Sequence, residues 1–460
     1  MDWSELEQSR IAILGTGREG QAAWRFLRAR LPGRELILID EAEPPVAFCG
    51  ELTRKDRLRV GPLAGAGLES FDLLVRSPGI SPYRESLLKA RESGVRITSP
   101  SNLWFADHPD APTICISGTK GKSTTSALTA HLLSAAGLRV QLAGNIGRPL
   151  LDCDDRDVDW WVIELSSYQL ADLEARPRVA VLLNLSPEHL DWHGGEARYR
   201  SDKLRLAELS AGNLLIANAA DGGLCEALGG YDVRWFNAPG AICAAKGRLL
   251  EKDKVCFDGE LPGLPGDHNL SNAAAALTVV RAVGADFRAA LAALPGFEAL
   301  PHRLQRIGER DGRRYVNDSI SSTPVATAAA LEALAGETVT LIAGGLDRGV
   351  DWAPYMPRFR AALPGAVITL PDNGDRICAA LASAGIEPPR GVHAAEDLAG
   401  AVSLAESLTP AGGIVLLSPG APSFPQFRDY RDRGDQFAKL CGVEAAHKSG
   451  AKPAESEGKK

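Results

Sequence analysis

The chain has 460 residues, enough for about three domains of roughly 150 residues each. Its net charge of −7, with no basic block before the extreme C-terminus, argues against nucleic-acid binding. There is no run of about 18 apolar residues, so we expect no membrane span. The acidic N-terminal residues contain no apolar signal core, so we expect no secretion, and the eight scattered cysteines lack metal-binding or redox spacing. We therefore expect a cytoplasmic protein with reduced thiols. We also expect a monomer.

The first segment predicts a parallel α/β unit with a glycine turn. The apolar run Ile11–Leu14 leads into Gly15-Thr16-Gly17-Arg18-Glu19-Gly20, and a second run, Leu36–Ile39, ends at Asp40. This order is typical of folds that bind a diphosphate at a helix N-terminus. The residues alone leave open a dinucleotide, a nucleoside diphosphate or a purely structural turn. The strand Leu73–Val75 is expected to end at the same sheet edge, followed by Ser77, Pro78 and Gly79.

The second segment opens with a shortened phosphate-binding loop. The strand Thr113–Ser117 precedes Gly118-Thr119-Lys120-Gly121-Lys122-Ser123-Thr124, and a helical stretch follows. Ile116 stands where the full P-loop pattern has its first glycine, so an ordinary turn is the alternative interpretation. In a phosphate loop, backbone N–H groups and Lys122 would bind the phosphates, and the hydroxyl of Ser123 or Thr124 would bind Mg²⁺.

Polar residues follow the neighbouring strands of this segment. Glu164 ends the strand Trp160–Ile163, and His189 lies in Asn184–Gly194 after the strand Val179–Leu183. A carboxylate beside a phosphate loop is suited to Mg²⁺, although a capping or salt-bridged glutamate is the alternative. We expect His189 to reach the same edge of the sheet.

Three further positions are ambiguous from the residues alone. Asn145, in a glycine turn, has an amide that suits a phosphate or carboxylate. Lys203, in the helix Tyr199–Leu206, is expected to be an exposed helical lysine. Asn269 and Asn272 open an alanine-rich helix, where they could cap it or contact an adenine edge.

The predicted fold class is α/β, with three domains of mostly parallel sheet. We place the domains at residues 1–108, 109–300 and 301–445, and expect a disordered tail at 446–460. The first and third domains are expected to be Rossmann-like, and the central domain to be a P-loop ATPase.

Taken together, these motifs resemble the Mur ligases, ATP-dependent ligases of peptidoglycan synthesis, and most closely the glutamate-adding, MurD-like branch. The resemblance covers about residues 5–443. It rests on the following segments: Gly118–Thr124, Gly144–Gly147, Glu164–Gln169, Asn184–Gly194, Tyr199–Lys203, His268–Asn272, Pro301–Arg303, Asn317–Ser319 and Leu417–Phe424.

The resemblance implies substrates, cofactors and residue roles. It implies ATP, two Mg²⁺ sites, UDP-N-acetylmuramoyl-L-alanine and glutamate. The catalytic residues would be Lys122, His189 and a carbamylated Lys203. The metal ligands would be Ser123 or Thr124, Glu164, His189 and Lys203. ATP would contact Gly118, Thr119, Lys120, Gly121, Lys122, Ser123, Thr124, Asn269, Asn272, Arg303 and Asp318. The UDP-sugar and glutamate would contact Gly15, Thr16, Gly17, Arg18, Asp40, Ser77, Gly79, Asn145, Arg348, Ser423 and Phe424.

The chain departs from the family pattern where that pattern contacts D-glutamate. The familiar form is Asn-Asp-Ser-Lys-Ala-Thr-Asn, and here Ile320 and Ser322 replace its lysine and threonine. Arg348 stands where a second lysine is common, and Lys120 stands where asparagine is usual. A variant branch of these ligases adds L-glutamate, and the departures favour that branch.

Four alternatives remain at this point. They are a ligase that adds D-glutamate, a folylpolyglutamate synthase, a non-enzymatic nucleotide-dependent binding protein and an NAD(P)-dependent oxidoreductase. The N-terminal glycine-turn domain argues against the folate enzyme, and the phosphate-loop domain argues against the oxidoreductase.

Overall fold

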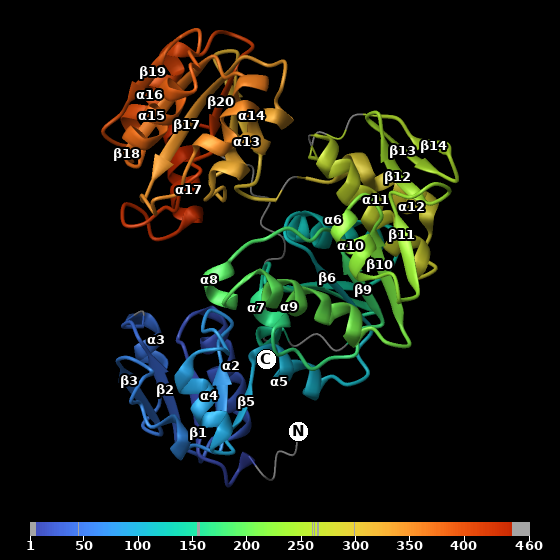
Figure 1. Ribbon diagram of the computed structural model, residues 1–460, viewed down its shortest axis with the longest axis vertical. Helices are drawn as coiled ribbons and strands as arrows, with labels where there is room; N and C mark the ends of the chain where they lie inside the picture. The colour runs from blue at the N-terminus through green and yellow to red at the C-terminus, as the bar shows by residue number, and fades with distance from the viewer. Residues whose placement is uncertain are drawn as a thin grey trace, which may run out of the picture. The chain divides into compact units, whose positions relative to one another are not determined.

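The computed structural model describes residues 6–443, except for residues 45, 154–156, 260, 262, 265 and 299. The described residues form two compact units (Figure 1). The first contains the described residues up to 259 together with 267–296, and the second contains those of 261–266 and 297–443. The unit boundary after Gly296 differs slightly from the one that the sequence predicts after residue 300. The predicted tail at 446–460 lies outside the described residues.

The first unit begins with a five-stranded parallel sheet of order β3-β2-β1-β4-β5. Alternate residues of β1 face opposite sides, because Ile11 and Ile13 join one apolar cluster and Ala12 and Leu14 join another. The strands are β1 Ile11–Leu14, β2 Leu36–Asp40, β3 Asp56–Val60, β4 Leu73–Arg76 and β5 Arg96–Thr98. The helices are α2 Arg18–Arg30, α3 Val46–Glu51, α4 Glu85–Glu92 and α5 Pro100–Asp107, with the 3₁₀ turn η1 Leu68–Ser70.

The central part of the same unit carries a six-stranded parallel sheet of order β11-β10-β9-β6-β8-β7 and a small antiparallel sheet, β12-β13-β14. The strands are β6 Thr113–Ser117, β7 Val140–Gly144, β8 Trp160–Glu164, β9 Val179–Leu182, β10 Leu214–Asn218, β11 Val233–Phe236, β12 Ile242–Ala245, β13 Arg248–Glu251 and β14 Lys254–Phe257. The helices are α6 Lys122–Ala135, α7 Ser167–Leu170, α8 Leu190–His193, α9 Glu196–Leu209, α10 Gly222–Ala227, α11 Asp267–Ala282 and α12 Phe287–Ala293, with η2 Leu150–Asp152 and η3 Leu294–Gly296.

The two sheets of the first unit share one hydrophobic core. Trp24 of α2 and Trp104 of α5 belong to the same buried cluster as Trp161 of β8 and Leu170 of α7. Trp104 and Trp161 are in edge contact, with ring centroids 4.8 Å apart. A shared core of this kind joins the predicted first and second domains into one compact unit.

The second unit has a sheet of order β15-β16-β20-β17-β18-β19, parallel except for β15. Apolar clusters cover both of its faces. The strands are β15 Gln305–Arg310, β16 Arg313–Asn317, β17 Val339–Gly345, β18 Ala366–Asp372, β19 Val392–Ala394 and β20 Ile414–Leu417. The helices are α13 Pro324–Ala333, α14 Met356–Ala361, α15 Gly374–Ser383, α16 Leu398–Leu408 and α17 Tyr430–Leu440, with η4 Ala353–Tyr355. The predicted α/β fold class with mostly parallel sheets is confirmed.

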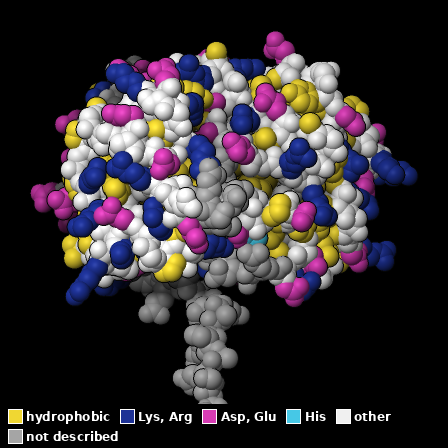
Figure 2. All heavy atoms as spheres, turned by 90° about the horizontal axis from the view of Figure 1, so that it is seen from below, with side chains coloured by type: hydrophobic (Ala, Val, Ile, Leu, Met, Phe, Trp, Pro, Cys, Tyr) yellow, Lys and Arg dark blue, Asp and Glu magenta, His cyan; other side chains and the backbone are white. Residues whose placement is uncertain are grey.

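On the face that Figure 2 shows, Lys and Arg side chains are interspersed with Asp and Glu side chains. Among the described residues, no helix combines the length and apolar character needed to cross a bilayer.

Candidate active site

The phosphate loop joins β6 to the N-terminus of α6. Gly118 and Gly121 both have positive φ angles, 157° and 82°. A Cβ atom on Gly121 would lie 2.4 Å from Oδ1 of Asn272, so this position requires glycine. Lys122 folds back over the loop, with Nζ 3.0 Å from the carbonyl oxygen of Gly118 and 2.8 Å from that of Thr119. The loop therefore has the helix N-terminus and the cation that an anionic phosphate needs.

Protein contacts hold this loop in shape. The Asn184 side chain accepts a hydrogen bond from Lys120 N at 2.8 Å and donates one to the Lys120 carbonyl oxygen at 3.0 Å. The buried Thr119 hydroxyl lies 2.6 Å from the Tyr199 hydroxyl. The exposed Lys120 ammonium forms an ion pair with Glu188 at 2.6 Å. Burial raises the pKa of Glu188, but Lys120 outweighs it and keeps that pKa below its usual range. Thr119 and Lys120 thus brace the loop through their side chains.

Glu164 is fully buried at the end of β8. Its Oε1 accepts a hydrogen bond from Nδ2 of Asn145 at 2.6 Å, whereas its Oε2 has no hydrogen-bond partner among the described residues. A buried carboxylate oxygen without a donor is costly unless a cation completes it, so the site fits a hard divalent ion such as Mg²⁺. The described residues contain no cluster of three acidic, His or Cys side chains able to hold a metal. Phosphate and hydroxyl oxygens would therefore complete the coordination, with Ser123 or Thr124 as the hydroxyl donor.

Lys203 is buried, with 2% of its surface exposed. Its Nζ lies 2.6 Å from the Gly118 carbonyl oxygen and 3.3 Å from Oγ of Ser117. The interpretation from residues alone, an exposed helical lysine, is wrong, because α9 turns this face toward the phosphate loop. Burial, reinforced by the nearby Lys122 charge, holds the pKa of Lys203 well below its ordinary value. The surroundings therefore disfavour the ammonium form relative to the neutral amine.

The two histidines of the segment after β9 face different surroundings. The side chain of His189 is half-exposed, and its ring lies 5.1 Å from that of Tyr168. Burial lowers the pKa of His189, with Glu188 opposing the shift. His193 is fully buried, with Nδ1 2.6 Å from Asp202 and Nε2 3.1 Å from the Ser167 hydroxyl. Only His189 remains available for a ligand.

The buried His193 belongs to a network that the sequence did not reveal. Asp202 also accepts a hydrogen bond at 2.6 Å from the hydroxyl of Tyr83, which lies 119 residues earlier. Burial lowers the pKa of His193 although Asp202 raises it, so a neutral ring can donate from Nδ1 and accept from Ser167. The network ties α9, which carries Lys203, to the N-terminal part of the unit.

The N-terminal glycine turn is held by Asp40 and Ser77. Thr16 donates to Oδ2 of Asp40 from its backbone at 2.5 Å and from its hydroxyl at 2.6 Å. Ser77 donates to the Gly15 carbonyl oxygen at 3.1 Å, and a Cβ on Gly15 would lie 3.0 Å from Ser77. Burial raises the pKa of Asp40, but the hydrogen bonds from Thr16 prevail and lower it. The Asp40 carboxylate is thus hydrogen-bonded to Thr16 of the glycine turn. Gly17 begins α2 as its N-cap.

Two residues beside this turn contact the central part of the unit. Arg18 donates a hydrogen bond to the carbonyl oxygen of Gly147. The Gly79 carbonyl oxygen accepts one from the Trp192 indole at 3.0 Å. The loop after β4 is therefore fixed to the segment that carries His189.

Sequence reasoning missed the role of Arg76, the last residue of β4. It is fully buried and forms two hydrogen bonds with Asp172, at 3.0 and 2.7 Å. Its Nη1 donates to the carbonyl oxygens of Ser77, Pro78 and Ile80. The one sequence feature that points to this role is a charged residue at the end of an apolar strand. Arg76 shapes the loop that would hold the UDP group.

The remaining nucleotide candidates lie in both units. Asn269 and Asn272 are buried in the first turns of α11, with Asn272 Nδ2 3.0 Å from Asn269 Oδ1. In the second unit, Asp318 is buried and accepts hydrogen bonds from Ser321 at 2.5 Å, Ser418 at 2.7 Å and Leu304 N at 3.1 Å. Burial raises the pKa of Asp318 to about 6. Asp318 therefore holds together the segments that carry Leu304, Ser321 and Ser418. The charge of the partly buried Arg303 acts on its carboxylate.

The amino-acid candidates lie on loops after β16, β17 and β20 of the second unit. Ile320 is half-buried, Ser322 and Arg348 are exposed, Ser423 is buried, and Phe424 is 55% exposed. These loops follow the carboxyl ends of neighbouring strands, where ligands of parallel sheets bind.

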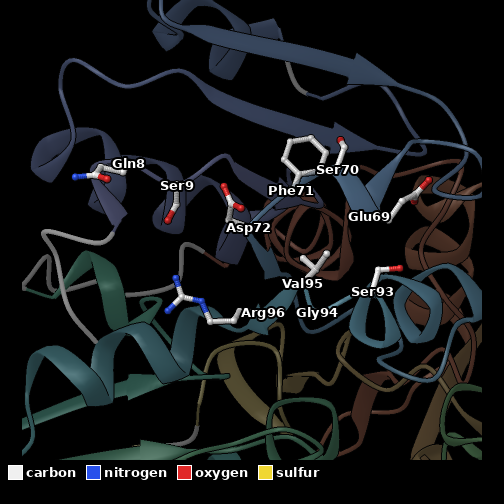
Figure 3. Close-up of a pocket in the computed structure, with 10 residues that line it drawn as sticks. All are labelled: Gln8, Ser9, Glu69, Ser70, Phe71, Asp72, Ser93, Gly94, Val95 and Arg96. Carbon is white, nitrogen blue, oxygen red and sulfur yellow. The ribbon is translucent and has the colours of Figure 1, made fainter.

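A separate polar pocket lies at the amino ends of β1, β4 and β5 (Figure 3). Ser9, Phe71, Asp72 and Arg96 are among its lining residues. It is at the opposite end of the sheet from the glycine turn and does not belong to the candidate site.

Comparison with known proteins agrees with this geometry. Three family models match the chain: the MurD-like N-terminal domain at residues 9–99, the Mur ligase middle domain at 116–234, and the Mur ligase glutamate ligase domain at 302–420. The chain belongs to the Mur ligase family. It is therefore an ATP-dependent ligase that forms amide bonds, of the MurD type. This confirms the predicted family and enzyme class and removes the oxidoreductase and non-enzymatic alternatives.

The curated relatives include proteins named UDP-N-acetylmuramoyl-L-alanine--L-glutamate ligase. The chain is 44% identical to the protein of Xanthomonas axonopodis pv. citri and to that of Xylella fastidiosa, in each case over 96% of this chain and 97% of the relative. A Micromonospora protein of the same name is 40% identical, over 97% and 99% of the two chains.

Solved structures share the fold at lower identity. MurC of Thermotoga maritima matches with a TM-score of 0.60 and 18% identity, over 94% of this chain and 99% of that chain. MurF of Thermotoga maritima, solved in complex with ADP, matches with a TM-score of 0.60 and 16% identity, over 95% and 96%. Folylpolyglutamate synthase of Mycobacterium tuberculosis matches with a TM-score of 0.55 and 19% identity, over 74% of this chain and 94% of that chain.

Proposed function

We propose that this ligase joins L-glutamate to the alanyl carboxylate of UDP-N-acetylmuramoyl-L-alanine, using ATP. The observation that carries the proposal is the pair Ile320 and Ser322, which replaces the lysine and threonine expected for a D-glutamate site. The names of the relatives at 44% identity support the same isomer. We expect the reaction to take place in the cytoplasm, where ATP and nucleotide sugars are available, and the enzyme to act as a monomer.

The proposed reaction has two steps. First, an oxygen of the alanyl carboxylate attacks the γ-phosphorus of ATP, which gives an acyl phosphate and ADP. Second, the neutral amine of glutamate attacks the acyl carbon. The amide bond then forms, inorganic phosphate leaves with the electrons of the broken C–O bond, and the amine loses a proton to solvent. The protein contributes mainly by positioning and by charge neutralisation.

The residues of the first unit support distinct roles in these steps. The loop glycines and the N-terminus of α6 would bind phosphate oxygens, and Lys122 would neutralise the charge that moves to the leaving ADP. Glu164 with Ser123 or Thr124 would hold one Mg²⁺, and His189 with Lys203 a second. Bound Mg²⁺ would supply charge neutralisation at the phosphates. The glycine turn with Thr16, Arg18 and Asp40, and the loop Ser77–Ile80, would hold the UDP group.

Lys203 is the candidate for carbamylation within this proposal. In that reaction the neutral Nζ attacks CO₂, a C–N bond forms, one proton is released, and the product is an anionic carbamate. The lowered pKa and the burial of Lys203 support it, because an amine must be unprotonated to attack CO₂. An anion there would suit a cation beside the phosphate loop better than an ammonium would.

The decisive test is an end-point assay with purified protein, ATP, Mg²⁺ and UDP-N-acetylmuramoyl-L-alanine. L-glutamate and D-glutamate are supplied in separate reactions, and ADP and the ligated product are measured. We expect a higher kcat/KM with L-glutamate. A preference for D-glutamate of about tenfold or more, equivalent to about 1.4 kcal/mol, would identify an ordinary D-glutamate-adding enzyme. Turnover with a folate substrate in place of the UDP-sugar would contradict both assignments.

A further inference from the structure

Arg433 of α17 is a buried cation with no acidic partner. Only 1% of its surface is exposed, and among the described residues no carboxylate forms an ion pair with it. Burial lowers the pKa of Arg433 to about 10, which still leaves it charged at neutral pH. An unpaired buried charge is costly, so a residue of this kind calls for a compensating function.

The hydrogen bonds of Arg433 converge on two loops that carry the amino-acid candidates. Nε donates to the Ser319 hydroxyl at 3.0 Å, and Nη2 donates to the carbonyl oxygens of Ser319 at 2.8 Å and Ala421 at 3.1 Å. Ser319 lies in the loop after β16 that continues to Ile320 and Ser322. Ala421 precedes Ser423 and Phe424 after β20. One guanidinium thus fixes both loops.

The end of β17, from which the third loop continues, lies against the same side chain. A Cβ on Gly345 would lie 3.2 Å from Nη1 of Arg433 and 2.5 Å from the carbonyl oxygen of Pro422. Gly345 has a φ of 148°, and its chain continues to Arg348. Nη1 itself is buried and has no hydrogen-bond partner among the described residues. The positive charge therefore lies just beneath the point where all three loops meet.

The orientation of glutamate in the proposed reaction favours one of its carboxylates. The attacking amine must face the acyl phosphate, and the α-carboxylate is attached to the same carbon as the amine. The side-chain carboxylate is the end of glutamate farthest from the reacting amine, so it is the group that the loops after β16, β17 and β20 can bind without touching the reacting atoms. Charge at that end is also what distinguishes glutamate from glutamine.

Resting on the proposed function, we infer that Arg433 is a positioning residue that makes this enzyme selective for an amino acid with a side-chain carboxylate. It acts through the Ser319 and Ala421 loops and through its uncompensated charge, because its own guanidinium is covered by Gly345. The family pattern has a lysine at position 320, and this chain has Ile320 there. Arg433 supplies a positive charge beneath the loops in its place. A lysine at this position could retain the positive charge but not the three hydrogen bonds, since only the planar guanidinium presents donors in that arrangement.

The test compares Arg433→Met and Arg433→Lys with Arg431→Met, which removes an exposed arginine from the same helix. KM is measured for L-glutamate, ATP and the UDP-sugar, together with the ratio of kcat/KM for L-glutamate over L-glutamine. For Arg433→Met we expect the glutamate KM to rise by about tenfold or more and the ratio to fall by a similar factor. For Arg433→Lys the ratio should be largely kept while kcat/KM falls. Arg431→Met should behave as wild type.

Each contrary outcome overturns the inference. Equal losses with glutamate and glutamine, or equal increases in the KM of all three substrates, would assign Arg433 a merely structural role. Failure of both Arg433 variants to give a cooperative thermal unfolding transition would do the same. The proposed function is judged separately by the wild-type protein, whose inactivity with glutamate and the UDP-sugar would overturn that function itself.

Discussion

Arg76 and Asp172 form a two-hydrogen-bond ion pair, with Nε to Oδ2 at 3.0 Å and Nη2 to Oδ1 at 2.7 Å. Arg76 ends β4, and Asp172 follows α7, a short helix that begins three residues after Glu164. The same guanidinium donates to three carbonyl oxygens of the loop Ser77–Ile80. The loop proposed for UDP is thus linked through one side chain to the segment proposed for Mg²⁺.

We predict that Arg76→Met destabilises the first unit by about 3–5 kcal/mol, because it leaves the mostly buried Asp172 carboxylate without its partner. The KM for the UDP-sugar should rise with little change in the KM for ATP. Urea unfolding and steady-state kinetics measure the two effects. Glu35→Gln, which breaks the exposed pair with Arg57, is the control and should cost less than about 1 kcal/mol. An unchanged UDP-sugar KM would separate Arg76 from the substrate loop.

Lys122→Ala should reduce ligation at least about 100-fold while the thermal unfolding temperature stays close to that of wild type. Its ammonium donates hydrogen bonds to the carbonyl oxygens of Gly118 and Thr119, and the residue is partly exposed rather than part of an apolar core. ADP release measures the loss. Lys89→Ala, at an exposed lysine of α4, serves as the control. Normal turnover by Lys122→Ala would remove this residue from the phosphate site.

Lys203→Ala should be nearly inactive, and bicarbonate should not restore it, because the variant has no amine to carbamylate. Partial recovery with a short carboxylate such as acetate or formate is the expected sign of a carbamate role. Wild-type protein equilibrated with ¹³C-bicarbonate should show a carbamate carbon resonance that Lys203→Ala lacks. A wild-type rate in Lys203→Ala would contradict the carbamate role and show that the reaction does not need this amine.

The raised pKa of Asp318 predicts that the second unit loses stability as pH rises. The folded carboxyl titrates at about 6 against an ordinary value of 3.8, so the folded state holds the proton more tightly. Its stabilising contribution is fully present below the ordinary pKa and is lost as pH rises through about 6, on the order of 3 kcal/mol in total. Unfolding free energies from pH 3.5 to 7 measure this. Asp318→Asn should remove that part of the dependence, and a parallel pH profile in the variant would contradict it.

The positions predicted best are those determined by local pattern. The glycine turns at Gly15–Gly20 and Gly118–Gly121, and Glu164 at a strand end, could be predicted because parallel strands place their carboxyl ends along one edge. The family resemblance supplied what the pattern could not, above all the importance of Lys203. The glutamate isomer and the individual residue roles remain predictions.

Residues missed from the sequence depend on contacts between distant segments. The burial of Lys203 follows from how α9 packs against the phosphate loop, 85 residues earlier in the chain. The Tyr83–Asp202 hydrogen bond spans 119 residues, and that between Arg433 and Ser319 spans 114. No periodicity within a single element encodes such pairs, so an isolated arginine or aspartate in the sequence looks like a solvated charge.

The position of β20 has a consequence for how the chain is made. This strand lies between β16 and β17 in the sheet, yet it is the last of the three to be synthesised. During translation the first unit has all its described strands once residue 257 has emerged from the ribosome, and its last helices soon after. The second unit lacks a central strand until Ile414–Leu417 emerges, and α17 with Arg433 comes later still. We expect nascent chains that stop before β20 to present a folded first unit and a protease-sensitive second one.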